Sequence, residues 1–74
     1  MYLFQYNTMK LTTTPEEVAS NTRKAWDILF DAFGFDTFHP IEGRGVLMHV
    51  LHLGRGIVQY TMQSLADRGY AIAP

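Results

Sequence analysis

Two stretches of this chain repeat their apolar residues with the period of an α-helix, and both apolar faces are wide. In residues 14–34 one face collects the residues Val18, Thr22, Ala25, Trp26, Leu29 and Phe33. Ile28 and Phe30 lie at the two edges of that face and widen it. Because a pair of helices lets each cover only one stripe of the other, we expect another element to cover the remainder.

Capping signals delimit the first helix. Thr14 is a residue type that caps helix N-termini, and Pro15 suits the first helical position because its missing N–H would be unpaired there. Glu17 lies where a capping box places its carboxylate, and Gly34 is a suitable C-terminal stop. The sequence therefore predicts one helix over residues 14–34.

The second apolar stretch, residues 46–69, follows a connection predicted over 35–45 and contains Gly54-Arg55-Gly56. These glycines form either the turn of a helix-turn-helix or a kink in one continuous helix. One helical phase is kept across them by Leu47, Val50, Leu51, Gly54, Ile57, Val58, Thr61, Met62 and Leu65. Because a turn usually resets that phase, we favour one kinked helix, although two glycines cost roughly 2 kcal/mol relative to alanines.

The ends of the chain are predicted to be extended. An aromatic-rich run with loose alternation, residues 2–11, indicates an arm or short strand within 1–13, and residues 70–74 form a tail. The expected fold is a single mainly α domain over 1–74, a helix hairpin with a kinked second helix, completed by dimerisation. The expected dimer interface consists of Leu47, Leu51, Gly54, Val58, Met62, Trp26 and Phe30.

Length and composition exclude several classes of protein. A chain of 74 residues has room for one domain with a marginal core, and without cysteine it can form neither disulfides nor cysteine-ligated metal sites. No apolar run approaches the roughly 18 residues of a membrane span, so a cytoplasmic location is expected. The net charge of -1 argues against non-specific nucleic-acid binding and leaves protein partners favoured.

No pattern of catalytic or metal-binding residues stands out. His49 and His52 are three residues apart and could bring two imidazoles to a metal with His39 or Glu42, but the His-Glu-x-x-His pattern is missing. The serines lie in no nucleophile-elbow pattern, and the glycine-rich stretch lacks the lysine of a phosphate loop. We therefore predict no enzymatic activity, no cofactor and no bound metal.

Residues 55–70 resemble the recognition helix of winged-helix repressors. The resemblance rests on Arg55, Gly56, Val58, Leu65, Gly69 and Tyr70 and is confined to this stretch. In that family the helix enters the major groove of DNA. The resemblance implies base and phosphate contacts by Arg55, Gln59, Tyr60 and Gln63.

Three functions are expected, in order of preference. The first is a non-enzymatic protein-binding module, a homodimer that acts stoichiometrically on a larger protein, as phage- or plasmid-type accessory inhibitors do. Its partner-binding residues would be His49, His52, Arg55, Gln59, Tyr60 and Gln63. The alternative is a helix-turn-helix DNA-binding transcriptional regulator, and the third possibility is a structural subunit of a larger assembly.

Overall fold

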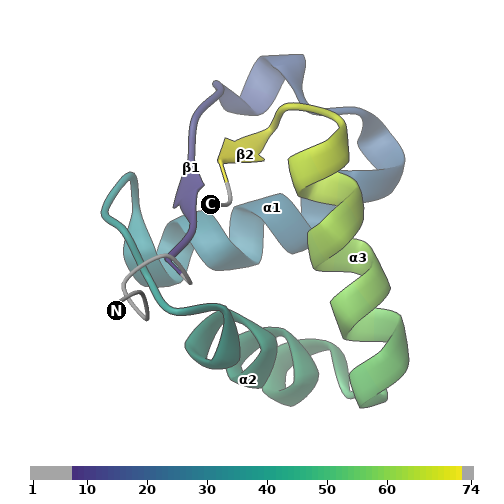
Figure 1. Ribbon diagram of the computed structural model, residues 1–74. Coiled ribbons are helices and arrows are strands. Elements are labelled where there is room, and N and C mark those ends of the chain that lie inside the picture. The colour runs from purple at the N-terminus through teal and green to yellow at the C-terminus, as the bar shows by residue number, and fades with distance from the viewer. Residues whose placement is uncertain (1–7, 73–74) are drawn as a thin grey trace.

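The computed structural model describes residues 8–72, which form a small, mainly helical domain (Figure 1). Its elements are β1 (Lys10–Leu11), the 3-10 helix η2 (Pro15–Glu17), α1 (Ser20–Phe33), α2 (Pro40–Leu51), α3 (Arg55–Asp67) and β2 (Ala71–Ile72). The prediction of a mainly α fold is confirmed. Residues 1–7 of the predicted arm and residues 73–74 of the tail lie outside the described residues.

The favoured prediction of one kinked helix over 46–69 is wrong, because α2 and α3 are separate helices. His52 ends α2 in the left-handed conformation, with φ 55° and ψ 40°, and Gly54 begins α3 from an extended conformation. In Figure 1, α2 runs across the lower part of the view and α3 runs up its right-hand edge. The apolar residues keep one helical phase across the turn because both helices direct a face to the same core. Two separate helices and one continuous helix can therefore show the same apolar pattern in the sequence.

The predicted connection over 35–45 is too long, because α2 already begins at Pro40. His39 caps the helix: the Ile41 N–H donates to His39 Nδ1 at 3.2 Å, and the His39 N–H donates to Glu42 Oε1 at 3.1 Å. This capping box offsets the low helix propensity of the two glycines that follow in the first turns of α2.

Gly43 is buried within α2, where it allows close packing. A Cβ atom at this position would lie 2.8 Å from Cε2 of Phe38 and 3.0 Å from Cε of Met62, both closer than an ordinary contact. Gly45, two residues later, has open space around it. The first glycine therefore serves the packing of α2 against its neighbours, and the second does not.

The first helix begins later than predicted and ends as predicted. Thr14 makes no capping hydrogen bond, and the Thr13 hydroxyl instead donates to Glu17 Oε1 at 2.6 Å. After η2 the chain becomes extended so that Val18 can be buried, and α1 starts at Ser20. The C-terminal stop is at Gly34, whose φ of +61° is one that glycine adopts without strain.

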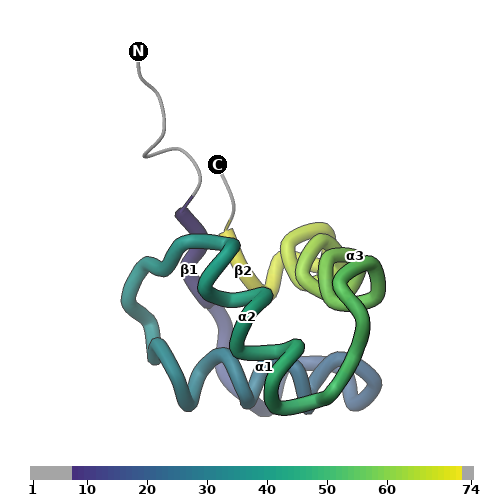
Figure 2. The backbone as a smooth tube through the Cα atoms, turned by 90° about the horizontal axis from the view of Figure 1, so that it is seen from below, coloured from purple at the N-terminus to yellow at the C-terminus, as the bar shows by residue number. Residues whose placement is uncertain are grey.

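A two-stranded antiparallel sheet joins the start and the end of the described chain. Lys10 pairs with Ile72 and Leu11 with Ala71. An isolated bridge links Met9 with Phe38 through backbone hydrogen bonds of 2.7 and 2.9 Å. The β1 segment therefore lies between Phe38 and β2, and both views show β1 beside β2 (Figures 1 and 2).

One core lies between the three helices and this sheet. Its fully buried large side chains are Trp26, Leu11, Leu29, Leu47, Leu65 and Val58. We expected one copy to leave much of this apolar surface uncovered, but packing of three helices and two strands covers most of it. No helix among the described residues is long and apolar enough to cross a membrane.

The prediction of the dimer interface is wrong for most of its residues, because they belong to the core of a single copy. Four of its residues are buried inside a single copy and cannot meet a partner without unfolding: Leu47, Val58, Met62 and Trp26. Leu51 and Phe30 are partly buried and pack against the same core. Gly54 is exposed, and nothing lies within 4 Å of where its Cβ would be.

Candidate functional site

α3 carries an exposed polar surface. The inner face of this helix is anchored by Val58, Met62 and Leu65, all of which are buried. Because side chains three and four residues apart share a face of a helix, the opposite face is directed away from the core. Tyr60 and Gln63 lie on that opposite face, and Arg55 and Gln59 lie along one edge of the buried face; all four are exposed, and they are four of the six predicted partner-binding residues.

The turn places this face at the edge of the domain. His52, Leu53 and Gly54 separate the two helices, and a turn of this length that contains glycine is typical of a helix-turn-helix. The first backbone hydrogen bond of α3 runs from the Val58 N–H to the Gly54 carbonyl at 3.1 Å. The amides of Arg55 to Ile57 precede this bond, so the start of α3 presents donors without a partner inside the helix. An anionic ligand is therefore favoured at this end.

The exposed side chains differ in how they are held. Gln63 Nε2 donates to Asp67 Oδ1 at 2.9 Å, which orients that amide along the helix. Arg55 and Gln59 make no hydrogen bond or ion pair with any described residue, so both can reach a ligand without breaking an internal contact.

The two predicted histidines lie on the other side of the turn. His49 is in the last turn of α2 and His52 is the residue that ends it, and both are exposed. Within residues 8–72 no group of three or more histidine, aspartate or glutamate side chains comes together to hold a metal. The histidines therefore extend the polar rim of the turn.

Charge is distributed unevenly between the two halves of the domain. Residues 40–72 contain three arginines, Arg44, Arg55 and Arg68, against Glu42 and Asp67. Residues 8–39 contain five carboxylates, Glu16, Glu17, Asp27, Asp31 and Asp36, against Lys10, Arg23 and Lys24. The small net charge of the chain thus conceals a slightly cationic helix-turn-helix and an acidic remainder.

Sequence reasoning missed that four apolar side chains in and around the turn are exposed. Val50, Leu53, Ile57 and Tyr60 expose 49%, 36%, 58% and 75% of their surface. Val50 and Ile57 were placed on the buried arc, because a single helix axis was assumed. Once the chain turns at 52–54, the arc of α2 and the arc of α3 no longer coincide, and their edge positions become exposed.

Comparisons with protein-family models, with curated proteins and with solved structures returned no match for this chain.

Proposed function

We propose that this chain is a cytoplasmic DNA-binding regulator in which α3 enters the major groove. The observation that carries the proposal is an exposed polar stripe of α3, in which Arg55, Gln59 and Gln63 follow one another at intervals of four residues along a helix whose buried face is fixed in the core. The major groove admits one α-helix, and the second helix of a helix-turn-helix contacts bases through its N-terminal residues.

The residue types on this face suit base edges. Arginine can donate two hydrogen bonds to guanine, and glutamine can bond to both N6 and N7 of adenine. Arg55 and Gln59 are one turn apart on α3, so they would reach neighbouring base pairs. Tyr60 is three residues from Gln63 on the same side of α3, and its exposed ring provides an apolar contact for thymine methyl groups or sugars.

The charge distribution supports specific binding over general affinity for DNA. Phosphate contacts supply most of the non-specific affinity, and the helix-turn-helix has only a few cations to make them. If two or three phosphates are neutralised by each copy, log K should fall with log[salt] with a slope of about −2 to −3. Binding by one copy should therefore be weak, with specificity resting on α3.

The test is a selection from a pool of random-sequence DNA duplexes at low salt, followed by fluorescence anisotropy on the enriched sequence. Arg55→Ala should weaken binding roughly 5- to 150-fold, the equivalent of one bidentate base contact. The matched control is Arg23→Ala, which removes the same charge from α1, where Arg23 pairs with Asp27 at 3.0 Å. Failure to enrich any sequence, or an equal loss in both variants, would exclude α3 as a reader of DNA.

A second candidate function is stoichiometric binding to a larger protein. The observation that favours it is the exposure of the apolar side chains of Leu53, Ile57 and Tyr60 in the turn and the first half of α3, since aromatic side chains are among the usual anchors of protein interfaces. On this hypothesis His49, His52 and the polar residues of α3 form the rim of the interface. Tyr60→Ala should then abolish capture of one defined partner from the source cell, while the duplex pool yields no enriched sequence.

A further inference from the structure

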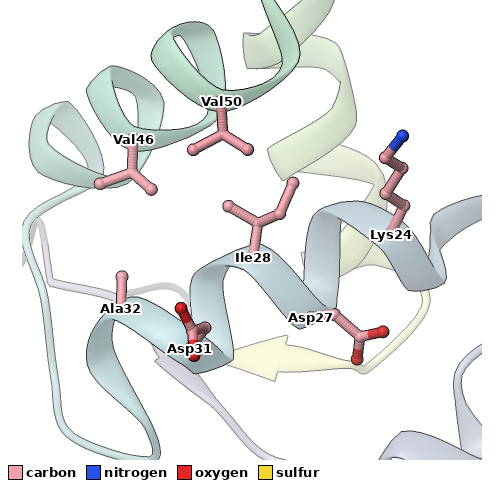
Figure 3. Close-up of a pocket in the computed structure, with 7 residues that line it drawn as sticks. All are labelled: Lys24, Asp27, Ile28, Asp31, Ala32, Val46 and Val50. Carbon is pink, nitrogen blue, oxygen red and sulfur yellow. The ribbon is translucent and has the colours of Figure 1, made fainter.

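An open groove lies between α1 and α2, and none of its lining residues comes from α3. It has a volume of about 290 Å³ and is lined by Lys24, Asp27, Ile28, Asp31, Ala32, Val46 and Val50. Figure 3 shows Ile28 and Ala32 projecting from α1 toward Val46 and Val50 of α2, with the charged side chains along α1. The groove therefore has an apolar floor and a charged rim.

The apolar floor is only partly covered within one copy. Val50 exposes 49% of its surface, Ala32 is exposed, and Ile28 and Val46 are partly buried. Removing such side chains from water is favourable, by about 25 cal/mol for each Å² of apolar area. A partner with an aliphatic surface of similar shape would gain this burial.

The rim indicates what that partner is. Asp27 already has a partner, because its carboxylate accepts from Arg23 Nε at 3.0 Å. Lys24 and Asp31 form no ion pair or hydrogen bond with the described residues, and they lie on either side of Ile28 along α1. Seven residues separate them, which is about 10.5 Å along the helix axis. One positive and one negative side chain are thus available at a fixed spacing.

This arrangement is complementary to itself. We propose that the groove is the interface of a homodimer, in which two α1 helices pack antiparallel about a two-fold axis passing between Asp27 and Ile28. Such an axis brings Lys24 of each copy to Asp31 of the other, so the symmetric contact contains two ion pairs. Val50 and Ile28 of the two copies then cover one another between these ion pairs.

The dimer is independent of the proposed function but compatible with it. The groove belongs to α1 and α2, so Arg55 and Gln59 on α3 stay accessible. A two-fold dimer of helix-turn-helix units would read two half-sites of a palindrome, which would supply the affinity that one weakly cationic copy lacks. Only this last consequence depends on DNA binding.

The dimer is tested by sedimentation equilibrium of the DNA-free protein at concentrations from a few to several hundred micromolar. Variants that exchange the charges at Lys24 and Asp31 are compared with the original protein. Lys24→Asp and Asp31→Lys should each weaken self-association at least about 10-fold, since each creates two like-charge contacts across the axis. The double variant carrying both exchanges should restore association to near the original strength. Val50→Asp, which places a charge on the floor of the groove, should abolish it.

Glu16→Lys is the matched control, because it changes the net charge as Asp31→Lys does but lies in η2, outside the groove. It should leave self-association unchanged. Circular dichroism of each variant verifies that the helices are folded. The proposal is overturned if the original protein stays monomeric throughout the range. It is also overturned if folded single variants associate normally, or if the folded double variant does not recover.

Discussion

Gly43 and Gly45 lie two residues apart in α2, and the structure gives alanine opposite effects at the two positions. In an exposed helix interior, glycine to alanine stabilises by about 1 kcal/mol, because alanine loses less backbone entropy on folding. Gly45 has nothing within 4 Å of its missing Cβ, so Gly45→Ala should gain that full amount.

At Gly43 the same gain is opposed by a steric overlap. The added Cβ would lie 2.8 Å from Cε2 of Phe38, so the ring must move by at least about 0.6 Å to reach the ordinary contact distance of 3.4 Å. That ring is stacked on Phe33, with centroids 4.4 Å apart, and cannot swing away freely. Overpacking of this kind costs about 1–3 kcal/mol, so Gly43→Ala should be net destabilising by about 1 kcal/mol.

Thermal unfolding of the two variants, followed by circular dichroism, measures the difference directly. For a domain of this size each kcal/mol shifts Tm by about 4–8 °C, so Gly45→Ala should melt higher than the original protein and Gly43→Ala lower. Because both variants add the same methyl group to the same helix, the gap between them isolates the steric cost. Equal Tm values would refute the close approach of α2 to Phe38, and destabilisation by both would refute a helix through residues 43–45.

Three further substitutions test the ends of the helices by urea denaturation. His39→Ala should lose about 1 kcal/mol by removing the cap of α2, and an equal loss in the exposed control His49→Ala would argue against a capping role. Ala19 is the N-cap of α1 and makes no side-chain cap, so Ala19→Ser should stabilise by about 1 kcal/mol; no gain would mean that α1 does not begin there. Tyr70→Phe should lower the free energy of unfolding by about 1 kcal/mol, because the Tyr70 hydroxyl accepts from the Ala19 N–H at 3.2 Å. Its control is Tyr60→Phe at an exposed position, which should leave stability unchanged. Equal stability of the two variants would contradict the Tyr70 hydrogen bond.

The sequence predicted the inner face and the end of the first helix, because both depend on local chemistry. The apolar period placed Trp26 and Leu29 on the apolar face, and both are fully buried, Trp26 in the core of a single copy and not in the predicted dimer interface. Gly34 ended the helix because few other residues adopt its backbone conformation without strain. The start was misplaced because burial of Val18, a tertiary effect, outweighs the capping signal of Thr14.

The second half of the fold was harder to predict, although a signal for its start was present. His39-Pro40-Ile41-Glu42 carries a proline at the first helical position and a glutamate two residues later, the pattern of a helix start. The glycines at 43 and 45 obscure this signal, because glycine is unfavourable in helices and typical of a connection. Gly43 is favourable in α2 because it allows close packing against Phe38 and Met62. Sequence periodicity carries no information about such tertiary contacts.

The exposure of the candidate site residues was predicted correctly, whereas most of the predicted dimer interface is buried. All six predicted partner-binding residues are exposed, because polar residues on one helical arc seldom face a core. Residues on the apolar arc were assigned to a second copy, but the core of a single copy buries Leu47 and Val58 completely. Periodicity identifies which face is apolar, and only the packing of the third helix shows what covers it.

The pairing of β1 with β2 also determines the order in which this protein matures on the ribosome. The two strands lie about 60 residues apart, so at 5–20 residues per second β1 waits about 3–12 s for its partner. The three helices can form within microseconds as they emerge, but the backbone of Lys10 and Leu11 and the Ala19 N–H lack their partners until the segment from Tyr70 to Ile72 appears. During that interval the nascent chain exposes an unpaired strand edge and part of its core to chaperones and proteases, so cellular yield should respond to translation speed.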